Sequence, residues 1–502
     1  MNSLCTDAGT LAQWPTAERV RALKRIIPRA QVQAILRRTG HARRRYLRLP
    51  AWFMVWFVIA LGLFCPDSYR QVFKWLQPFR RRGTPGRSTL CEARQRLGVV
   101  PLQRLAQQVI ALQATPDTPG AFYHGLRLMA LDSFVVDVPD SLANARVFGR
   151  PGSGRSPAAF PQARVLALCE VGTHVLWRTL TKPCHRSEVL MAAFLLRFLQ
   201  QDMLLLWDRG FLSYDLVQQV CTRRAHLLAR IKNNLVFRPL RRLRDGSFLA
   251  KLYASPRHRD RDEGGRLVRI IEYTLDDPGR PGSGQKHRLL TTLLDATRHP
   301  AERLITLYHE RWEEELASDE LKTHQRARPV LRSETPAGVV QEIEGLLLAH
   351  YVVRVLMSEA ARQNNLPPRR LSFTGTLKVL RCRLPECPKS RSGLRRWYED
   401  LLAEIAEEVL PERRERINPR VIKRKMSNWR KKRPEHRQYP QPTKKFRQSI
   451  VLLSCAVLGL IAPRSDRCRL GERACSRPES QLPICWASRP RIRRGSSWRR
   501  TA

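Results

Sequence analysis

Several features that define whole classes of protein are missing from this chain of 502 residues. Its 12 cysteines include no Cys-x-x-Cys pair, and neither Cys382 with Cys387 nor Cys184 with His185 gives a four-ligand zinc pattern. Twelve cysteines in a chain of this length also do not amount to the dense disulfide framework of a small secreted domain. We therefore expect reduced thiols and no zinc site of this kind.

The sequence also lacks an apolar run of membrane-spanning length. The one membrane-like segment, AWFMVWFVIALGLFC at residues 51–65, has 15 residues, whereas about 20 are needed to cross a bilayer. The first 14 residues do not show the basic-then-apolar order of a signal peptide. We predict a buried helix at residues 51–65 in a soluble cytoplasmic protein that makes no contact with a membrane.

Acidic residues are scarce. The chain has 44 Asp and Glu against 91 Lys and Arg, which gives a formal charge of +47. Because so many cations repel one another, this excess favours a polyanionic partner, and nucleic acid is the leading class. An anionic membrane surface and a GC-rich genome that favours arginine codons are the alternatives that composition alone leaves open.

Hydrophobic periodicity divides the chain into segments of different kinds. Residues 1–125 read as a helical N-terminal domain that binds DNA, although a plain helical bundle fits the pattern equally well. Residues 126–232 read as an α/β unit, and residues 233–295 read as an antiparallel insertion in which Arg244-Asp245-Gly246 marks a hairpin. In the α/β unit we predict strands at 126–138, 164–171, 175–180, 203–207 and 226–231, with helices at 189–199 and 213–221.

The C-terminal half is predicted to be helical and then atypical. Residues 296–330 contain a strongly helical stretch from 301 to 326, and residues 331–449 form a helical, basic C-terminal region. The tail at 450–502 is rich in Arg, Ser and Pro, and it reads as disordered or as out-of-frame GC-rich sequence.

Two aspartates follow apolar runs that are typical of buried strands. Asp132 lies within Leu128–Phe134, and Asp208 comes directly after the wholly apolar run MLLLW. Ligands of α/β sheets bind at the carboxyl ends of the strands, so an Asp at that point faces the ligand. For either residue alone, a turn or capping role is the simpler explanation.

A polar stripe on the helix at 301–326 supplies a third carboxylate. With Tyr308 set to zero on a wheel of about 100° per residue, Arg311, Glu315 and Lys322 fall at roughly −60°, −20° and −40°. Asp319, at about +20°, shares this face on geometry alone. Glu313 and Glu314 fall on other faces of the wheel and are predicted to be solvated.

Two carboxylates at strand ends and one on a helix are a donor set suited to Mg²⁺, which prefers oxygen ligands and leaves positions open for phosphate. Two such ions can activate the attacking oxygen and stabilise the leaving oxygen in an in-line displacement. The cations on the same helix face would then hold phosphates.

These residues resemble the DDE transposases of the insertion sequence 4 family. The resemblance covers roughly residues 20–450 and rests on Asp132, on Asp208-Arg209-Gly210-Phe211-x-Ser213, and on the complete pattern Tyr308-x2-Arg311-x3-Glu315-x6-Lys322. Three shorter matches support it: Asn144, Phe148-Gly149 and Gly172-Thr173-His174.

The resemblance implies an α/β RNase H-like catalytic core with an inserted antiparallel β subdomain, flanked by the helical N-terminal domain and the basic C-terminal region. It implies that Asp132, Asp208 and Glu315 are the catalytic residues and hold Mg²⁺, for which Mn²⁺ is expected to substitute. The residues that it implies in DNA binding are Tyr308, Arg311, Lys322, Arg209 and Phe211.

The activity implied by the resemblance is cut-and-paste transposition, which in this family often runs through a hairpin intermediate. The enzyme would bind the terminal inverted repeats, cleave them and join the 3′-OH ends to target DNA. Its partners would be transposon ends and target DNA, with a homodimer on two ends, in the cytoplasm at the bacterial nucleoid. Two alternatives remain: an RNase H-like nuclease without strand transfer, and a decayed transposase that binds ends without catalysis.

Overall fold

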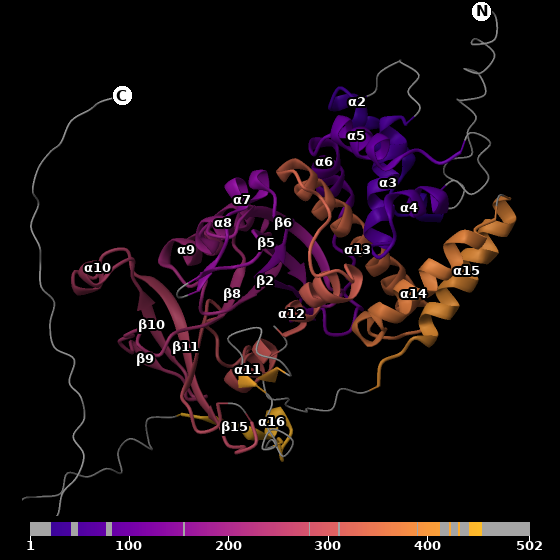
Figure 1. Ribbon diagram of the computed structural model, residues 1–502. Coiled ribbons are helices and arrows are strands. Elements are labelled where there is room, and N and C mark those ends of the chain that lie inside the picture. The colour runs from indigo at the N-terminus through magenta and orange to yellow at the C-terminus, as the bar shows by residue number, and fades with distance from the viewer. Residues whose placement is uncertain are drawn as a thin grey trace, which may run out of the picture. The chain divides into compact units, whose positions relative to one another are not determined.

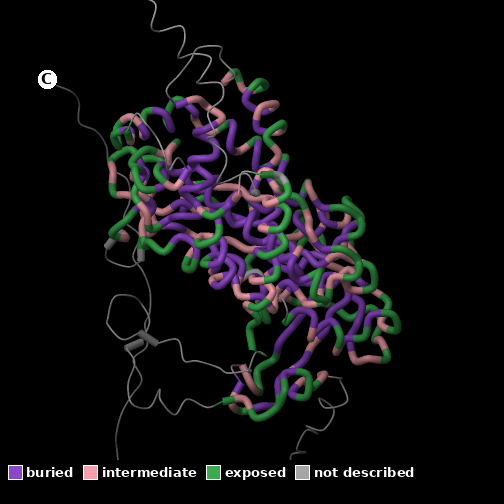
Figure 2. The backbone as a smooth tube through the Cα atoms, turned by 90° about the vertical axis from the view of Figure 1, so that its right-hand side faces the viewer, coloured by how far each residue is buried: buried purple, intermediate pink, exposed green. Residues whose placement is uncertain are grey.

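The computed structural model describes residues 22–41, 49–76, 83–153, 156–280, 282–309, 312–388, 390–411, 421–422, 430–431 and 441–453. Residues 1–455 form one compact unit, and the second unit, residues 456–502, lies outside the described residues. The buried residues run through the interior of the described chain, with exposed residues at its periphery (Figure 2).

Short helices form the N-terminal region, as the apolar periodicity predicts: η1 (Ala22–Arg25), α2 (Arg29–Arg38), α3 (Ala51–Leu63), α4 (Tyr69–Leu76), α5 (Arg87–Leu97) and α6 (Val100–Val109). Helix α3 is the apolar segment, and every residue from Phe53 to Leu63 is buried. It packs against the long helix α13 (Pro336–Gln363) (Figure 1). Among the described residues, no helix is both long and apolar enough to span a membrane.

Helices α3 and α13 approach closely because glycine stands at their crossing. A Cβ at Gly62 would lie 2.5 Å from the carbonyl oxygen of Gly345, and a Cβ at Gly345 would lie 2.7 Å from Val58 Cγ1. Neither position has room for a side chain. The N-terminal helices are therefore held against α13 by direct backbone contact.

A mixed sheet forms the centre of the fold. Its first five strands are β2 (Leu126–Asp137), β5 (Gln162–Glu170), β6 (Val175–Pro183), β7 (Met203–Trp207) and β8 (His226–Arg230), in the spatial order β6-β5-β2-β7-β8. Strands β2, β5 and β6 pair antiparallel, whereas β7 and β8 run parallel to β2. This order fits the expected RNase H-like core. The smaller elements around it are β1 (Phe122–Tyr123), α7 (Leu142–Phe148), β3 (Gly152–Ser153), β4 (Ser156–Pro157), α8 (Glu188–Leu195), η2 (Leu196–Phe198) and α9 (Tyr214–Thr222).

The insertion continues this same sheet. Its elements are β9 (Arg241–Arg242), β10 (Phe248–Leu252), α10 (Pro256–Asp260), β11 (Arg266–Leu275) and β12 (His287–Thr291). The predicted hairpin joins β9 to β10, and Gly246 takes a φ of +80° there. Because β12 pairs antiparallel with β8, the insertion extends the core sheet into one sheet of 11 strands that includes β1 and β15.

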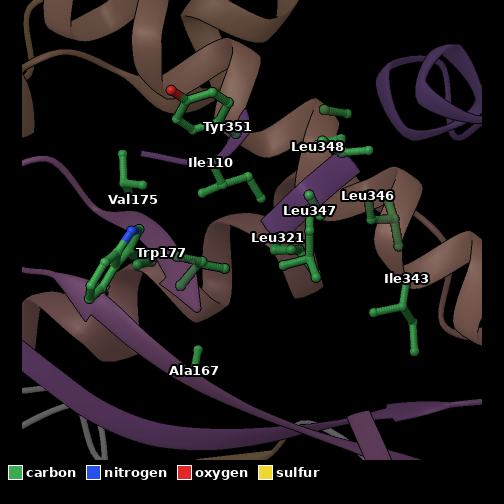
Figure 3. Close-up of a cluster of buried hydrophobic side chains, with 14 of the residues drawn as sticks. Ile110, Ala167, Val175, Trp177, Leu321, Ile343, Leu346, Leu347, Leu348 and Tyr351 are labelled. Atoms are coloured by element: carbon green, nitrogen blue, oxygen red, sulfur yellow. The ribbon is translucent and has the colours of Figure 1, made fainter. Parts of the chain in front are cut away.

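Helices dominate the rest of the chain: α11 (Ala301–His309), α12 (Trp312–Asp319), the π-helix η3 (Glu320–Gln325), α13, η4 (Pro368–Arg370), α14 (Phe373–Arg383), η5 (Leu384–Glu386) and α15 (Arg391–Glu407). In one buried cluster, Leu321 of η3 lies with Leu346 and Leu347 of α13, close to Val175 and Trp177 of β6 (Figure 3). Much of the basic stretch after α15 lies outside the described residues, apart from the short strands β13 (Val421–Ile422) and β14 (Arg430–Lys431).

The predicted boundary at residue 450 falls inside an ordered segment. Helix α16 (Phe446–Ser449) leads into β15 (Ile450–Leu452), which pairs antiparallel with β11. The fully buried carboxylate of Asp277 accepts hydrogen bonds from the backbone of Thr443 and Lys444, at 3.1 and 3.3 Å. The prediction of an atypical tail from residue 450 is therefore wrong at its start, because Ile450–Leu452 complete an edge of the sheet.

Candidate active site

Asp132 and Asp208 stand side by side on parallel strands. Leu131 of β2 pairs with Trp207 of β7, and each aspartate is the next residue of its chain. Neighbouring strands lie about 4.8 Å apart, so the two backbones are adjacent at this point. Alternation along β2 and β7 gives both aspartates the sheet face of Leu128, Ala130, Leu204 and Leu206, which is the face covered by α11.

Glu315 reaches the same region from α12, which contacts β2. A cavity of about 320 Å³ lies between the two elements. Asp132, Glu315 and Lys322 line it, together with Ser133, Phe134, Leu316, Ser318 and Asp319. Two carboxylates and one cation of the predicted set thus share one cavity, and Asp208 is the neighbour of Asp132 on the next strand.

The donor set suits a hard divalent cation, because Asp132 and Glu315 present carboxylates to a half-exposed cavity that leaves room for phosphate. Within the described part of the chain, however, no three His, Cys, Asp or Glu side chains lie close enough together to hold a metal ion. Asp132 and Glu315 therefore line one cavity, Asp208 lies on the neighbouring strand, and these residue types fit a divalent cation.

Tyr308 has a different position from the predicted one at the phosphates. Its side chain is 9% exposed, and its hydroxyl donates to the carbonyl oxygen of Trp207 at 3.3 Å. That carbonyl belongs to the residue before Asp208, so Tyr308 ties α11 to the end of β7. Arg311 lies outside the described residues.

The segment after Asp208 forms a tight turn into α9. The amide of Phe211 donates to the carbonyl of Asp208 at 3.1 Å, and Ser213 caps α9 by accepting from the amide of Leu216 at 3.2 Å. Arg209 is exposed and free to meet a polyanion, whereas Phe211 is 2% exposed and packs in the core. The predicted contact of Phe211 with DNA is therefore not available in this conformation, because the core covers the ring.

The sequence interpretation of Glu313 as solvated is wrong. Glu313 is 7% exposed, and its carboxylate lies 2.9 Å from Nε2 of His174. Burial would raise the pKa of Glu320, seven residues on, but Arg354 and His174 outweigh it and hold the pKa of that carboxyl well below 4.5. In the sequence, the only hints of these buried contacts are the seven-residue spacing of Glu313 and Glu320 and the turn at Gly172-Thr173-His174.

Asn144 is also structural. It is fully buried, and its amide donates to the carbonyl oxygens of Pro139 and Ser333, both at 3.1 Å. It thereby joins α7 to the loop that precedes α13.

Comparison with known proteins identifies the family. Residues 17–107 match the family described as insertion element 4 transposase N-terminal, and residues 123–352 match the transposase DDE domain. The transposase InsG for insertion sequence element IS4 of Escherichia coli (strain K12) is 30% identical over 402 residues, which cover 78% of this chain and 89% of InsG.

Two further proteins are similar over parts of the chain. The putative transposase InsZ of Escherichia coli (strain K12) is 28% identical over 202 residues, 39% of this chain and 67% of InsZ. A solved structure of the piggyBac transposase synaptic complex with hairpin DNA covers 78% of this chain and 85% of its own at 12% identity, with a TM-score of 0.35 that is too low to bear on the fold. The two domain matches and the similarity to InsG show that the chain belongs to the insertion sequence 4 family of DDE transposases.

Proposed function

We propose that this transposase binds the terminal inverted repeats of an insertion sequence, cleaves them, and joins the freed 3′-OH ends to target DNA. Asp132, Asp208 and Glu315 are the catalytic residues of this proposal. The observation that carries it is the cavity between β2 and α12, which is lined by Asp132, Glu315 and Lys322. Carboxylates repel phosphate, so a protein of charge +47 gains nothing for DNA binding from keeping them there unless they hold a cation.

Each residue of the cavity has a distinct task in this proposal. Asp132 and Asp208, on adjacent strands, and Glu315, on the helix, would hold a Mg²⁺ ion. A bound divalent ion activates the attacking oxygen and stabilises the leaving oxygen of phosphoryl transfer, and Mn²⁺ can substitute for Mg²⁺. Lys322 on the same cavity binds a phosphate of the scissile strand. Tyr308 holds the end of β7 and so fixes Asp208.

The remaining parts of the proposal concern the partners. The N-terminal helices bind the transposon ends, and exposed Arg209 supports the DNA beside the carboxylates. Synapsis of two ends requires two active sites, so a homodimer forms on DNA. Binding should weaken steeply with salt, because contacts to phosphate release counterions.

The test is cleavage of labelled inverted-repeat DNA in Mg²⁺ by the full chain. Asp208→Asn and Glu315→Gln should each abolish cleavage while leaving end binding intact in a mobility-shift assay. Asp215→Asn, which removes an exposed acid from α9, is the matched control and should cleave normally. Cleavage that survives Asp208→Asn or Glu315→Gln would refute the site.

The products separate the activities. Joined product with target DNA supports transposition, whereas nicked ends without joining identify a nuclease. A wild-type chain that shifts the DNA but does not cut it identifies a binding protein, and the proposed function then fails.

A further inference from the structure

A buried cluster of charged residues and histidines lies on the side of α12 opposite Glu315. Its members come from the β5–β6 turn, from α12, from η3 and from α13, and each is at most 9% exposed: His174, Glu313, Glu320, His350 and Arg354. We call these five residues the His174 cluster. Burying ionised groups is costly unless they are paired, so such a cluster needs a reason to exist.

His174 is the bridge of the cluster. Its Nε2 lies 2.9 Å from the carboxylate of Glu313, and its Nδ1 lies 3.0 Å from Glu320 and 2.7 Å from Nη2 of Arg354. Each ring nitrogen therefore faces a carboxylate, Glu313 at Nε2 and Glu320 at Nδ1, and the guanidinium of Arg354 lies beside Nδ1. Arg354 also donates from Nε to Glu320 at 2.9 Å, and Nε2 of His350 lies 3.2 Å from the same oxygen.

The turn that carries His174 is rigidly held. His174 has a φ of +58°, which is uncommon for a residue with a side chain, and its amide donates to the carbonyl of Glu170 at 2.8 Å. A Cβ at Gly172 would lie 2.7 Å from the Cα of Ala121, so the turn sits directly against that segment. The fully buried carboxylate of Glu170 accepts from the amides of Gln113 and Ala114 at 2.9 and 3.0 Å.

The two glutamates that His174 bridges set the rotation of the helix between them. Glu313 and Glu320 are seven residues apart and meet the same ring, whereas Glu315 is about 200° from Glu313 around the helix axis. Anchoring one side of α12 therefore turns the other side, with Glu315, toward the cavity of Asp132. Leu321, next to Glu320, adds apolar contact with α13 (Figure 3).

We propose that His174 is a positioning residue, which locks α12 in the rotation that brings Glu315 to face Asp132. This inference rests on the proposed function, because it assigns to Glu315 the binding of a divalent ion. It predicts that the loss of His174 weakens metal binding even where the protein stays folded and still binds DNA. A role in general stability would instead lower all three properties together.

The experiment compares four full-length variants: His174→Ala, His174→Gln, Glu315→Gln and Leu401→Ala. Glutamine retains a donor for Glu313 and an acceptor for Arg354, so it should restore most of the function. Leu401 is 1% exposed on α15, away from α12, and its truncation supplies a matched loss of stability. The measurements are Mn²⁺ binding by electron paramagnetic resonance, thermal melting, binding to end DNA, and the rate of end cleavage.

His174→Ala should raise the Mn²⁺ dissociation constant at least tenfold and slow cleavage at limiting Mn²⁺ by a similar factor, with binding to end DNA within twofold of wild type. His174→Gln should stay within about threefold of wild type, and Leu401→Ala should melt earlier with unchanged Mn²⁺ affinity. Mn²⁺ affinity within twofold of wild type in His174→Ala overturns the inference. The same holds if Leu401→Ala loses Mn²⁺ affinity to the same extent at equal loss of melting temperature. Glu315→Gln separates the two hypotheses: if it binds Mn²⁺ and cleaves normally, the proposed function fails instead.

Discussion

Glu344 on α13 gives the sharpest prediction about stability. Its side chain is 8% exposed, and burial raises its pKa from 4.5 to about 7, against a smaller opposing effect of a hydrogen bond with Gln103 of α6. The folded state therefore favours the protonated carboxyl, whereas the unfolded chain ionises it near 4.5. Below pH 4.5 this carboxyl does not lower the free energy of unfolding. As the pH rises toward 7, it lowers the free energy of unfolding progressively.

The magnitude follows from the size of the shift. One pKa unit corresponds to about 1.4 kcal/mol, so ionisation of Glu344 costs the folded state about 3 kcal/mol at pH 8. Glu344→Gln replaces the carboxyl beside Gln103 with an amide of nearly the same size, which cannot ionise. The variant should therefore match wild type near pH 4.5 and exceed its free energy of unfolding by up to about 3 kcal/mol at pH 8.

The assay is thermal or urea unfolding of wild type and Glu344→Gln at several pH values between 5 and 8.5. The difference between the two proteins isolates this carboxyl from the other titrating groups. Glu399→Gln on α15 is the control for removing a carboxylate, because the side chain of Glu399 is 59% exposed. A difference between wild type and Glu344→Gln that stays constant from pH 5 to 8.5 would refute the reasoning.

Three further predictions concern the site, the helix crossing and the C-terminal segment. Lys322→Ala should weaken productive binding of end DNA about 10- to 100-fold in cleavage kinetics without a change in melting temperature, because under the proposed function it removes one charge-assisted contact to phosphate. Gly345→Ala should lower the free energy of unfolding by about 1–3 kcal/mol, since the new methyl would overlap Val58, and an unchanged melting temperature would contradict that overlap. A chain that ends at Pro440 should melt several degrees below one that ends at Leu453 in calorimetry, because it lacks β15; equal melting would show that β15 adds nothing.

Local sequence patterns predicted much of the catalytic core. The apolar run at 203–207 is β7 to the residue, and the strands predicted at 126–138 and 226–231 match β2 and β8 to within one residue. Those patterns are strong because a strand buried on both faces must be continuously apolar. For the same reason the two aspartates after such runs could be recognised as candidates before any geometry was known.

Contacts between remote segments could not be predicted in this way. The pairing of β12 with β8 joins the insertion to the core sheet, and the pairing of β15 with β11 recruits a short apolar stretch at the start of the segment that was predicted to be an atypical tail. Neither pairing leaves a local signature, because an edge strand satisfies its backbone hydrogen bonds with whichever partner the fold brings near.

The helix wheel failed for a related reason. It separated Glu313 from the face of Glu315, Asp319 and Lys322, as the structure does, but it assigned Glu313 to solvent because a wheel does not show what packs against the other faces. Burial of Glu313 also depends on His174, which is 139 residues away in the sequence. A wheel describes one helix, so it cannot show a partner on another element.

The carboxylates on opposite faces of the α12–η3 segment have different surroundings. On one face Glu313 and Glu320 are bonded to His174 and Arg354 inside the protein, so they offer little to a passing cation. On the other face Glu315 opens with Asp132 and Lys322 onto a cavity that solvent reaches. Under the proposed function, a divalent ion at this cavity would meet Glu315 rather than Glu313 or Glu320, because those two carboxylates are already bonded inside the protein.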